Sequence, residues 1–297
     1  MPKDTVHIPV LLKETIEILA VKDEDVVLDA TVGGGGHSEE LLKTANIKLI
    51  GLDADPAAIA RVGWRLASYG ERVQLAPSNF RVVGSVLEKL QVEHVDKALF
   101  DLGLSSDELE VSGRGFSLQK NEPLQMTFDP MQLLSARDLL THLSREELTN
   151  ILRNYGEEKY AWAIAGAVIE AREREPIETT TQLVEIIKGA VPKSYLKGKI
   201  HPATKTFQAL RIAVNDELDS LKQGLAGVWE KLAPGGRLAV ISFHSIEDRI
   251  VKVFMKEKVD QGEGSLLTRK PITASEAEVQ ANPRSRSAKL RGIQKND

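Results

Sequence analysis

Residues 26–37 of the chain are Val-Val-Leu-Asp-Ala-Thr-Val-Gly-Gly-Gly-Gly-His, a short apolar run that ends in an acid and leads into four glycines. The apolar run predicts a buried strand over residues 26–28, and a short helix is expected to follow at residues 37–43. Glycines at such a junction let the backbone approach a ligand closely, next to the free amides of the helix N-terminus. The stretch therefore predicts a ligand site at the end of the first strand.

Strand and helix patterns alternate on both sides of this stretch. Further strands are expected at residues 48–52, 73–75, 97–100 and 237–243, and further helices at residues 9–20, 56–69, 81–90 and 204–232. Pro9 suits the first turn of the first helix, and Asp55 is expected to cap the helix that begins at Pro56. This alternation is typical of an α/β fold with a doubly wound parallel sheet and helices on both faces.

The alternation is interrupted between residue 105 and about residue 202, where helices are expected without strands. Ser144 and Glu147 form a capping box, and helices are expected at residues 157–172 and 181–190. The predicted organisation is one α/β domain made of residues 1–104 and 204–297, with a helical insert at residues 105–203. The polar, basic tail from Asn282 onward is expected to be irregular.

Composition excludes several classes of protein. The 297 residues carry 39 Lys and Arg against 43 Asp and Glu, a net charge of −4, so any nucleic-acid contact must use a local basic patch. With 0 cysteines, the chain has no disulfide, Cys–zinc site, iron–sulfur cluster or thiolate nucleophile, and no metal is expected. It also lacks a membrane-spanning apolar run and a signal peptide, so the cytoplasm is the expected location.

The acids at the strand ends indicate which ligand the glycine loop takes. Ser38 stands where the dinucleotide fingerprint requires its third glycine, counted from Gly33. Asp29, at the end of the first strand, would repel a pyrophosphate but attract a cofactor with a cationic amino-acid end, such as S-adenosylmethionine. Asp53, at the end of the second strand, is placed to accept hydrogen bonds from a ribose diol. The alternative is a tight turn, with Asp53 as a helix cap.

A second short motif follows the fourth expected strand. Residues 101–106 are Asp-Leu-Gly-Leu-Ser-Ser, at the carboxyl edge where open α/β sheets bind ligands. Methyltransferases that act on amino groups of nucleic acids place a short polar motif here to hold the exocyclic amine. A plain turn at the end of the strand is the alternative.

The sequence resembles the RsmH (MraW) family, bacterial methyltransferases that act on the N4 of a cytidine in small-subunit ribosomal RNA. The resemblance covers nearly the whole chain and rests on the following motifs: residues 7–12 (His-Ile-Pro-Val-Leu-Leu), 35–38 (Gly-Gly-His-Ser), 53–56 (Asp-Ala-Asp-Pro), 101–106, 114–117 (Arg-Gly-Phe-Ser), 155–158 (Tyr-Gly-Glu-Glu), 201–209 (His-Pro-Ala-Thr-Lys-Thr-Phe-Gln-Ala), 242–249 (Ser-Phe-His-Ser-Ile-Glu-Asp-Arg) and 282–287 (Asn-Pro-Arg-Ser-Arg-Ser).

This resemblance implies a class I methyltransferase domain with an inserted helical, RNA-binding domain, and a substrate in the decoding region of 16S ribosomal RNA within the small subunit. The implied contacts of S-adenosylmethionine fall on Gly35, Gly36, His37, Asp53, Phe80, Asp101 and Glu108. The family commonly has Gln at position 108. It also has an acid and a base where this chain has Gln125 and Thr127.

The expected reaction needs an acceptor for the amine hydrogens of cytosine, because the amine lone pair is delocalised into the ring. Asp101 or a nearby carbonyl can serve, with Ser105 as a helper. Methylation at C5 of cytosine usually requires a thiolate, which this chain lacks. His244 could be a base, but a structural histidine or a helix cap is an equal interpretation.

Basic residues that could hold RNA phosphates occur in two clusters, one near the return from the insert and one in the tail. The clusters are Lys193, Lys197, Lys199, His201 and Lys205, and Arg284, Arg286, Lys289, Arg291 and Lys295. A solvated charged surface is the alternative. Two other functions stay open at this point. A nicotinamide oxidoreductase would share the alternating pattern, and a non-catalytic RNA-binding assembly factor would explain the basic residues.

Overall fold

The computed structural model describes residues 9–104 and 112–297. These residues form two compact units, one from Met1–Ser105 and Leu218–Asp297 and the other from Ser106–Glu217. The strands are β1 (Val26–Asp29), β2 (Lys48–Asp53), β3 (Val73–Pro77), β4 (Val95–Asp101), β5 (Leu232–Ser242), β6 (Gly264–Leu266), β7 (Ile272–Thr273) and β8 (Lys289–Lys295).

The strands belong to the first unit, which is a mixed α/β structure. Its helices are α1 (Leu12–Leu19), α2 (Gly36–Thr44), α3 (Pro56–Arg65), α4 (Val83–Lys89), α12 (Glu217–Lys231), α13 (Ser245–Asp260) and α14 (Glu276–Ala281), with 3-10 turns at Ala67–Arg72, Phe80–Val82 and Pro283–Ser287. The second unit contains α6 (Ala136–His142), α7 (Arg145–Gly156), α8 (Ala161–Arg172), α9 (Thr180–Ala190), α10 (Lys193–Leu196) and α11 (Thr204–Asn215). No helix among the described residues is long and apolar enough to cross a membrane.

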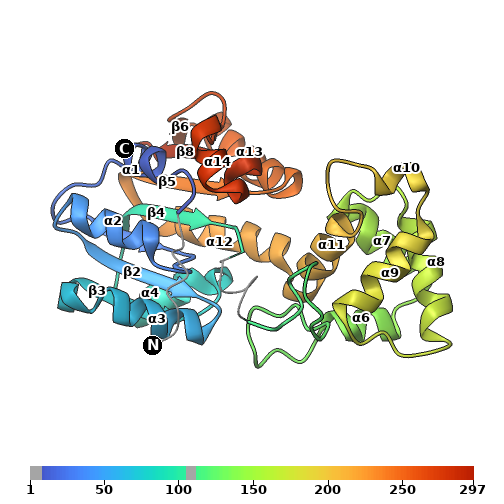
Figure 1. The fold of residues 1–297 in the computed structure, drawn as a ribbon. Helices are drawn as coiled ribbons and strands as arrows, with labels where there is room; N and C mark the ends of the chain where they lie inside the picture. The colour runs from blue at the N-terminus through green and yellow to red at the C-terminus, as the bar shows by residue number, and fades with distance from the viewer. Residues whose placement is uncertain (1–8, 105–111) are drawn as a thin grey trace. The chain divides into compact units, whose positions relative to one another are not determined.

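The sheet of the first unit has the strand order β3-β2-β1-β4-β5-β8-β6, with β7 paired to β8 (Figure 1). The strands from β3 to β5 are parallel, and β8 runs antiparallel to β5. The chain runs outward from β1 to β3 and then returns to place β4 on the other side of β1. This reversal is the switch point at which open α/β sheets bind their ligands.

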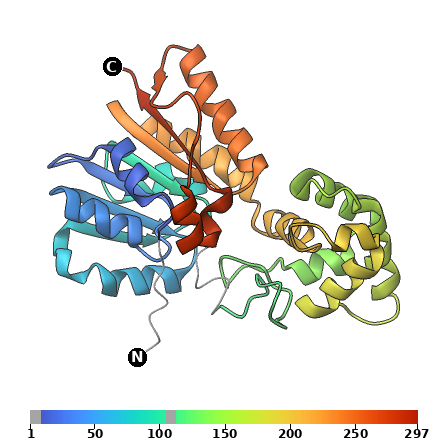
Figure 2. The same cartoon turned by 45° about the horizontal axis from the view of Figure 1, so that its top comes forward.

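Side chains alternate between the two faces of the sheet and form two separate cores, because successive residues of a strand point to opposite sides. Leu28 and Phe100 lie in the core covered by α4, α12 and α13. Val27, Leu49 and Leu99 lie in the core covered by α1, α2 and α3. Helices therefore cover both faces, as Figure 2 also shows, and the expectation of a doubly wound sheet is confirmed.

The expectation of an irregular tail is wrong. Residues 289–295 form β8, which lies within the sheet between β5 and β6. Its segment Lys-Leu-Arg-Gly-Ile-Gln-Lys looks basic, yet Leu290 and Ile293 are fully buried. The charged residues of this segment suggest an irregular tail, but the segment forms a strand because it pairs with β5, which is distant in the sequence.

Three helix boundaries also differ from the prediction. The long helix expected at residues 204–232 is broken at Asp216, whose φ of 47° is left-handed, and α11 groups with the helical unit. The first helix begins at Leu12 rather than Pro9, because Leu11 is also left-handed, with φ 52°. Glu157 is the left-handed cap of α7 and not the start of the next helix. Non-glycine residues seldom adopt this conformation, so local sequence patterns do not indicate such breaks.

The helical unit has its own internal support. Helices α6, α7 and α9 each begin with a capping box, and that of Ser144 and Glu147 was predicted. Pairs of buried apolar residues come from α7, α8 and α9: Leu148 and Leu152, Ile164 and Val168, and Leu183 and Ile187. The short helix α10 is fixed by Tyr195, whose hydroxyl donates to the carboxylate of Glu158 over 2.7 Å.

Candidate cofactor site

The acids expected at the strand ends lie at one edge of the sheet. Asp53, Asp29 and Asp101 are the last residues of β2, β1 and β4, which are neighbours in that order. Phe80 follows β3, the next strand outward. Because these strands are parallel, their carboxyl ends meet at the switch point of the sheet (Figure 1). The fold thus brings together residues that are far apart in the sequence.

The glycine loop joins β1 to α2 in a conformation that only small residues allow. Gly35 precedes the helix with φ 76°, in the left-handed region. A Cβ on Gly36 would lie 2.3 Å from Cγ of Pro9, so this glycine is required by close packing. The loop is therefore closely packed, and α2 begins immediately after Gly35. The amides at the N-terminus of α2 can bind a polar ligand.

Asp53 anchors the glycine loop to the second strand. Its Oδ2 accepts a hydrogen bond from the Gly33 amide over 2.9 Å, and its Oδ1 accepts one from the Asp55 amide over 2.8 Å. Asp55 caps α3 by accepting from the Ala57 amide, as predicted. Each carboxylate oxygen has a second lone pair, so Asp53 can still accept from a ribose hydroxyl. Burial raises the pKa of Asp53 above its usual range.

Asp29 is almost completely buried behind the loop. Ser38 of α2 donates to its Oδ2 over 2.6 Å, and the Thr31 amide donates to its Oδ1 over 3.2 Å. Burial raises the pKa of Asp29 to about 6, although the Ser38 bond favours the ionised form. Ser38, which stands where a dinucleotide site has glycine, therefore holds the acid that repels pyrophosphate. This contact supports the choice of a cationic cofactor.

Asp101 has the least satisfied side chain of the group. Its backbone amide donates to the Thr31 hydroxyl over 2.6 Å, which fixes the end of β4 against the loop. Its Oδ2 lies 3.5 Å from Nδ1 of His37, and its buried Oδ1 has no hydrogen-bond partner among the described residues. Burial raises the pKa of Asp101 to about 7. A hydrogen bond from the Gly103 amide opposes this rise, and the charge of Glu247 adds to it. A buried acceptor without a donor is expected to meet one on a ligand.

Phe80 makes core contacts in addition to its place near the site. Its ring meets that of Phe100 edge-to-face, with centroids 5.4 Å apart, and a Cβ on Gly224 of α12 would lie 2.7 Å from it. These contacts fix the ring beyond the end of β3, and the ring is only half-buried. Phe80 as a packing surface for adenine stays a prediction.

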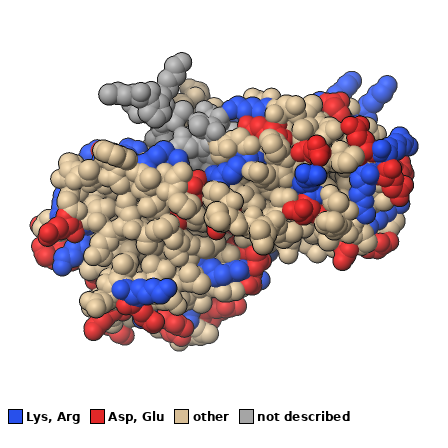
Figure 3. Space-filling view, turned by 90° about the horizontal axis from the view of Figure 1, so that it is seen from below, with Lys and Arg blue, Asp and Glu red and all other residues tan. Residues whose placement is uncertain are grey.

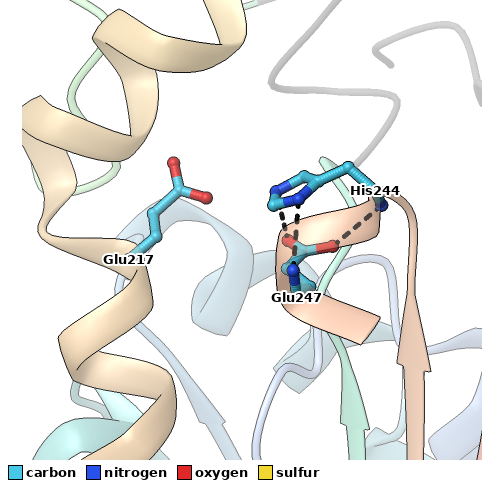
Figure 4. Close-up of side chains that lie close together, drawn as sticks. All are labelled: Glu217, His244 and Glu247. Carbon is cyan, nitrogen blue, oxygen red and sulfur yellow. Dashed lines mark hydrogen bonds and ion pairs between the residues drawn. The ribbon is translucent and has the colours of Figure 1, made fainter. Parts of the chain in front are cut away.

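Other predicted residues have different positions. Ser105 and Glu108 lie outside the described residues. His244 is the cap of α13 and forms a capping box with Glu247, which confirms its interpretation as a helix cap (Figure 4). Glu217, also drawn in Figure 4, belongs to the helical unit and accepts two hydrogen bonds from Arg211.

Sequence reasoning missed two groups that support the site. The Thr31 hydroxyl holds the Asp101 amide, and the Val10 carbonyl lies 3.0 Å from Nε2 of His37. Thr31 is part of the run that predicted the site, so its position beside the strand end was a usable signal. A backbone carbonyl such as that of Val10 has no sequence signature.

The departures from the family pattern lie in the helical unit. Gln125 is exposed, whereas Thr127 is buried, and the Thr127 carbonyl accepts a hydrogen bond from Arg114. An acid and a base are absent together from these two positions. If the acid and the base of the family pair with each other, replacing both together can leave the stability of the fold nearly unchanged.

A doubly wound sheet with a glycine loop at its switch point and carboxylates on three adjacent strand ends defines an α/β enzyme that binds an adenosine-containing cofactor with a cationic part. Comparison with known proteins is more specific: residues 4–296 match the model of the MraW methylase family, and the chain belongs to that family. It is a methyltransferase, and its cofactor is S-adenosylmethionine. The oxidoreductase and the non-catalytic assembly factor are thereby excluded.

Two curated relatives are similar to this chain over nearly their whole lengths. A protein of Heliobacterium modesticaldum is 46% identical, covering 97% of this chain and 98% of its own. A protein of Symbiobacterium thermophilum is 47% identical, covering 97% and 96%. Both are named ribosomal RNA small subunit methyltransferase H. A solved rRNA methylase from Streptococcus thermophilus aligns over 96% of this chain at 14% identity and a TM-score of 0.42.

The residues present fit this cofactor. The buried, unpartnered Oδ1 of Asp101 offers an acceptor, and the carboxylates of Asp29 and Asp53 supply negative potential at the same edge. Asp53 would hold the ribose, the loop at Gly35 and Gly36 would face the amino-acid part, and Asp101 would complete the site. When bound, the cofactor supplies a methyl group activated by a sulfonium. The assignment of these individual contacts stays a proposal.

Proposed function

We propose that this enzyme methylates the N4 of a cytidine in the decoding region of 16S ribosomal RNA, and that its substrate is the RNA within the small ribosomal subunit. The names of the curated relatives support the class of substrate. The family resemblance of the motifs at residues 101–106 and 201–209 supports the N4 position. A ribosomal substrate also favours the cytoplasm as the place of action.

The observation that supports this reaction is the buried carboxylate oxygen of Asp101, which has no hydrogen-bond partner among the described residues. Attack by an exocyclic amine places positive charge on nitrogen, so a buried acceptor near the amine lowers the barrier. Asp101 stands at the carboxyl edge with Oδ1 unpartnered, and with 0 cysteines the chain has no thiolate for a covalent route to C5. Ser105 is proposed as a helper that orients the base. A target base inside structured RNA must be splayed out before it reaches this edge.

The nature of the product tests this function directly. Unmodified small-subunit ribosomal RNA and assembled small subunits are treated with the purified enzyme and methyl-labelled cofactor. The RNA is then digested to nucleosides for mass spectrometry against standards. We expect the label in N4-methylcytidine. Label in 5-methylcytidine, in 2′-O-methylcytidine or in another base would disprove the assignment, and the comparison of the two substrates shows whether the subunit context is needed.

Fewer of the basic residues can contact RNA than the two clusters in the sequence suggest. Several members of the two basic clusters are already bonded within the protein. Lys289 and Arg291 contact Asp248, Lys295 donates to two backbone carbonyls, and Lys205 donates to the Glu157 carbonyl. The exposed members are Lys193, Lys197, Lys199, His201 and Arg286. Lys and Arg are interspersed with Asp and Glu on the face shown in Figure 3, so we propose local phosphate contacts rather than a broad basic field.

Removing exposed cations is expected to weaken RNA binding and reduce its salt dependence. The variant combines Lys193→Ala, Lys197→Ala, Lys199→Ala and Arg286→Ala. Each lost phosphate contact lowers the slope of log affinity against log salt by about 0.7–0.9. Binding to small subunits is measured between low and physiological salt, and affinity for the cofactor should hardly change.

A double variant of Lys43→Ala and Lys256→Ala is the matched control, because these lysines already pair with Glu39 and Asp260. Its salt slope should remain that of the wild type. An unchanged slope in the fourfold variant would show that the clusters are only a solvated surface.

A further inference from the structure

His37 and Asp101 place two acceptor atoms close together unless one of the two side chains carries an extra proton. Nε2 of His37 lies 3.0 Å from the Val10 carbonyl, which can only accept, so Nε2 carries the hydrogen. In a neutral imidazole Nδ1 is then an acceptor. It lies 3.5 Å from Oδ2 of Asp101, which is also an acceptor when the carboxyl group is ionised. Two acceptors only 3.5 Å apart repel each other in this largely buried place, and protonation of either partner removes the repulsion.

The surroundings favour keeping that proton. Within residues 9–104 and 112–297, the ionisable groups that act on the pair from other elements are acids: Asp29 of β1, Glu247 of α13 and Glu278 of α14. Ser38 satisfies Asp29, and the Leu11 amide donates to Glu278. Ionisation of Asp101 therefore adds a further negative charge to a place that already holds three acids.

Burial determines which partner holds the proton. It lowers the pKa of His37, so the imidazole stays neutral. It raises the pKa of Asp101 to about 7, well above the usual range of a carboxyl group. Below about pH 7, the favoured state of the free enzyme is therefore a protonated Asp101 next to neutral His37.

We propose that His37 and Asp101 share one proton in the cofactor-free enzyme, and that binding of S-adenosylmethionine releases it. The cationic cofactor favours the ionised form of Asp101. Below about pH 7, Asp101 thus becomes an ionised acceptor only when the methyl donor is present. His37 is a positioning residue in this process, because its fixed Nδ1 holds the carboxyl proton until then. The inference concerns cofactor binding and does not depend on which base is methylated.

The direction of the pH dependence follows from proton linkage. Below about pH 7 the cofactor must displace a proton, so its affinity falls by up to about tenfold for each unit of decreasing pH. Above that pH, Asp101 is already ionised and affinity no longer depends on this group. Proton release should therefore approach one per cofactor near pH 6 and vanish from this pair well above pH 7.

Calorimetry measures this release without any turnover. The full chain is titrated with S-adenosylmethionine at pH 6.5 in buffers of different ionisation enthalpy, and the slope of observed heat against ionisation enthalpy gives the protons released. We expect most of one proton for the wild type. His37→Asn can direct an amide donor at Asp101, so the carboxylate is ionised before binding. Proton release, measured at saturating cofactor, should then be lost whatever the change in affinity.

Asp29→Asn is the matched control, because Asp29 is the other buried acid with a raised pKa. Release that persists in this variant supports the pair. Release that persists in Asp101→Asn but disappears in Asp29→Asn assigns the proton to Asp29 and overturns the proposal. Should His37→Asn fail to fold, nitrogen NMR of the wild-type imidazole decides. A neutral ring with hydrogen on Nε2 is expected, and an imidazolium in the free enzyme at pH 6.5 would contradict the proposal.

Discussion

Replacing Asp101 with asparagine is expected to lower turnover by about 100-fold or more while the protein remains folded, which is the range of a lost acid–base group. Asparagine keeps the shape of the side chain and one acceptor oxygen, but it cannot become negatively charged. The developing charge on the amine nitrogen is then no longer compensated at the buried Oδ1 position. Single-turnover rates at saturating cofactor separate this loss from weaker binding.

Asp96 offers a matched control on the same strand. It lies at the opposite end of β4, where its carboxylate accepts from the Val26 amide over 2.8 Å. Asp96→Asn changes the same chemical group at the amino edge of the sheet, away from the ligand edge. Its turnover should stay within about twofold of the wild type, because it contacts no reacting group. Equal losses in the two variants would mean that Asp101 acts through stability alone.

Replacing Asp53 with alanine is expected to weaken S-adenosylmethionine binding by about 1.5–3 kcal/mol, the range for a hydrogen bond to a charged group. This corresponds to an increase in Kd of about 10- to 150-fold, measured by calorimetry. Two effects add. The ribose loses its acceptor, and the Gly33 amide loses the contact that fixes the glycine loop. Asp53→Asn keeps one acceptor oxygen and should show a smaller loss.

Asp55→Ala distinguishes a lost ligand contact from general disturbance of this turn. Asp55 is two residues away and caps α3 through the Ala57 amide. Its removal should cost about 0.5–2 kcal/mol of unfolding free energy, as for other helix caps, and leave cofactor affinity near that of the wild type. If Asp53→Ala leaves affinity unchanged in a folded protein, Asp53 is only a loop anchor.

Local sequence determined most of the α/β unit and the place of its ligand edge. The runs that became β1, β2 and β4 are short, apolar and end in an acid, so their boundaries and their terminal carboxylates could be predicted together. Asp55 and Pro56 likewise marked the start of α3. These signals are local, because a strand that is buried on both faces must be apolar throughout.

Only the tertiary structure decided the features that depend on distant partners. β8 looked like a basic tail because its stability comes from pairing with β5 and from burial of Leu290 and Ile293, neither of which its own sequence displays. The break at Asp216 requires a left-handed residue that no glycine marks. The proton requirement of His37 and Asp101 arises because the fold places two acceptors together and orients one by a backbone carbonyl. The sequence by itself determined which groups can ionise, whereas the fold decided, through burial and contact, which of them share a proton.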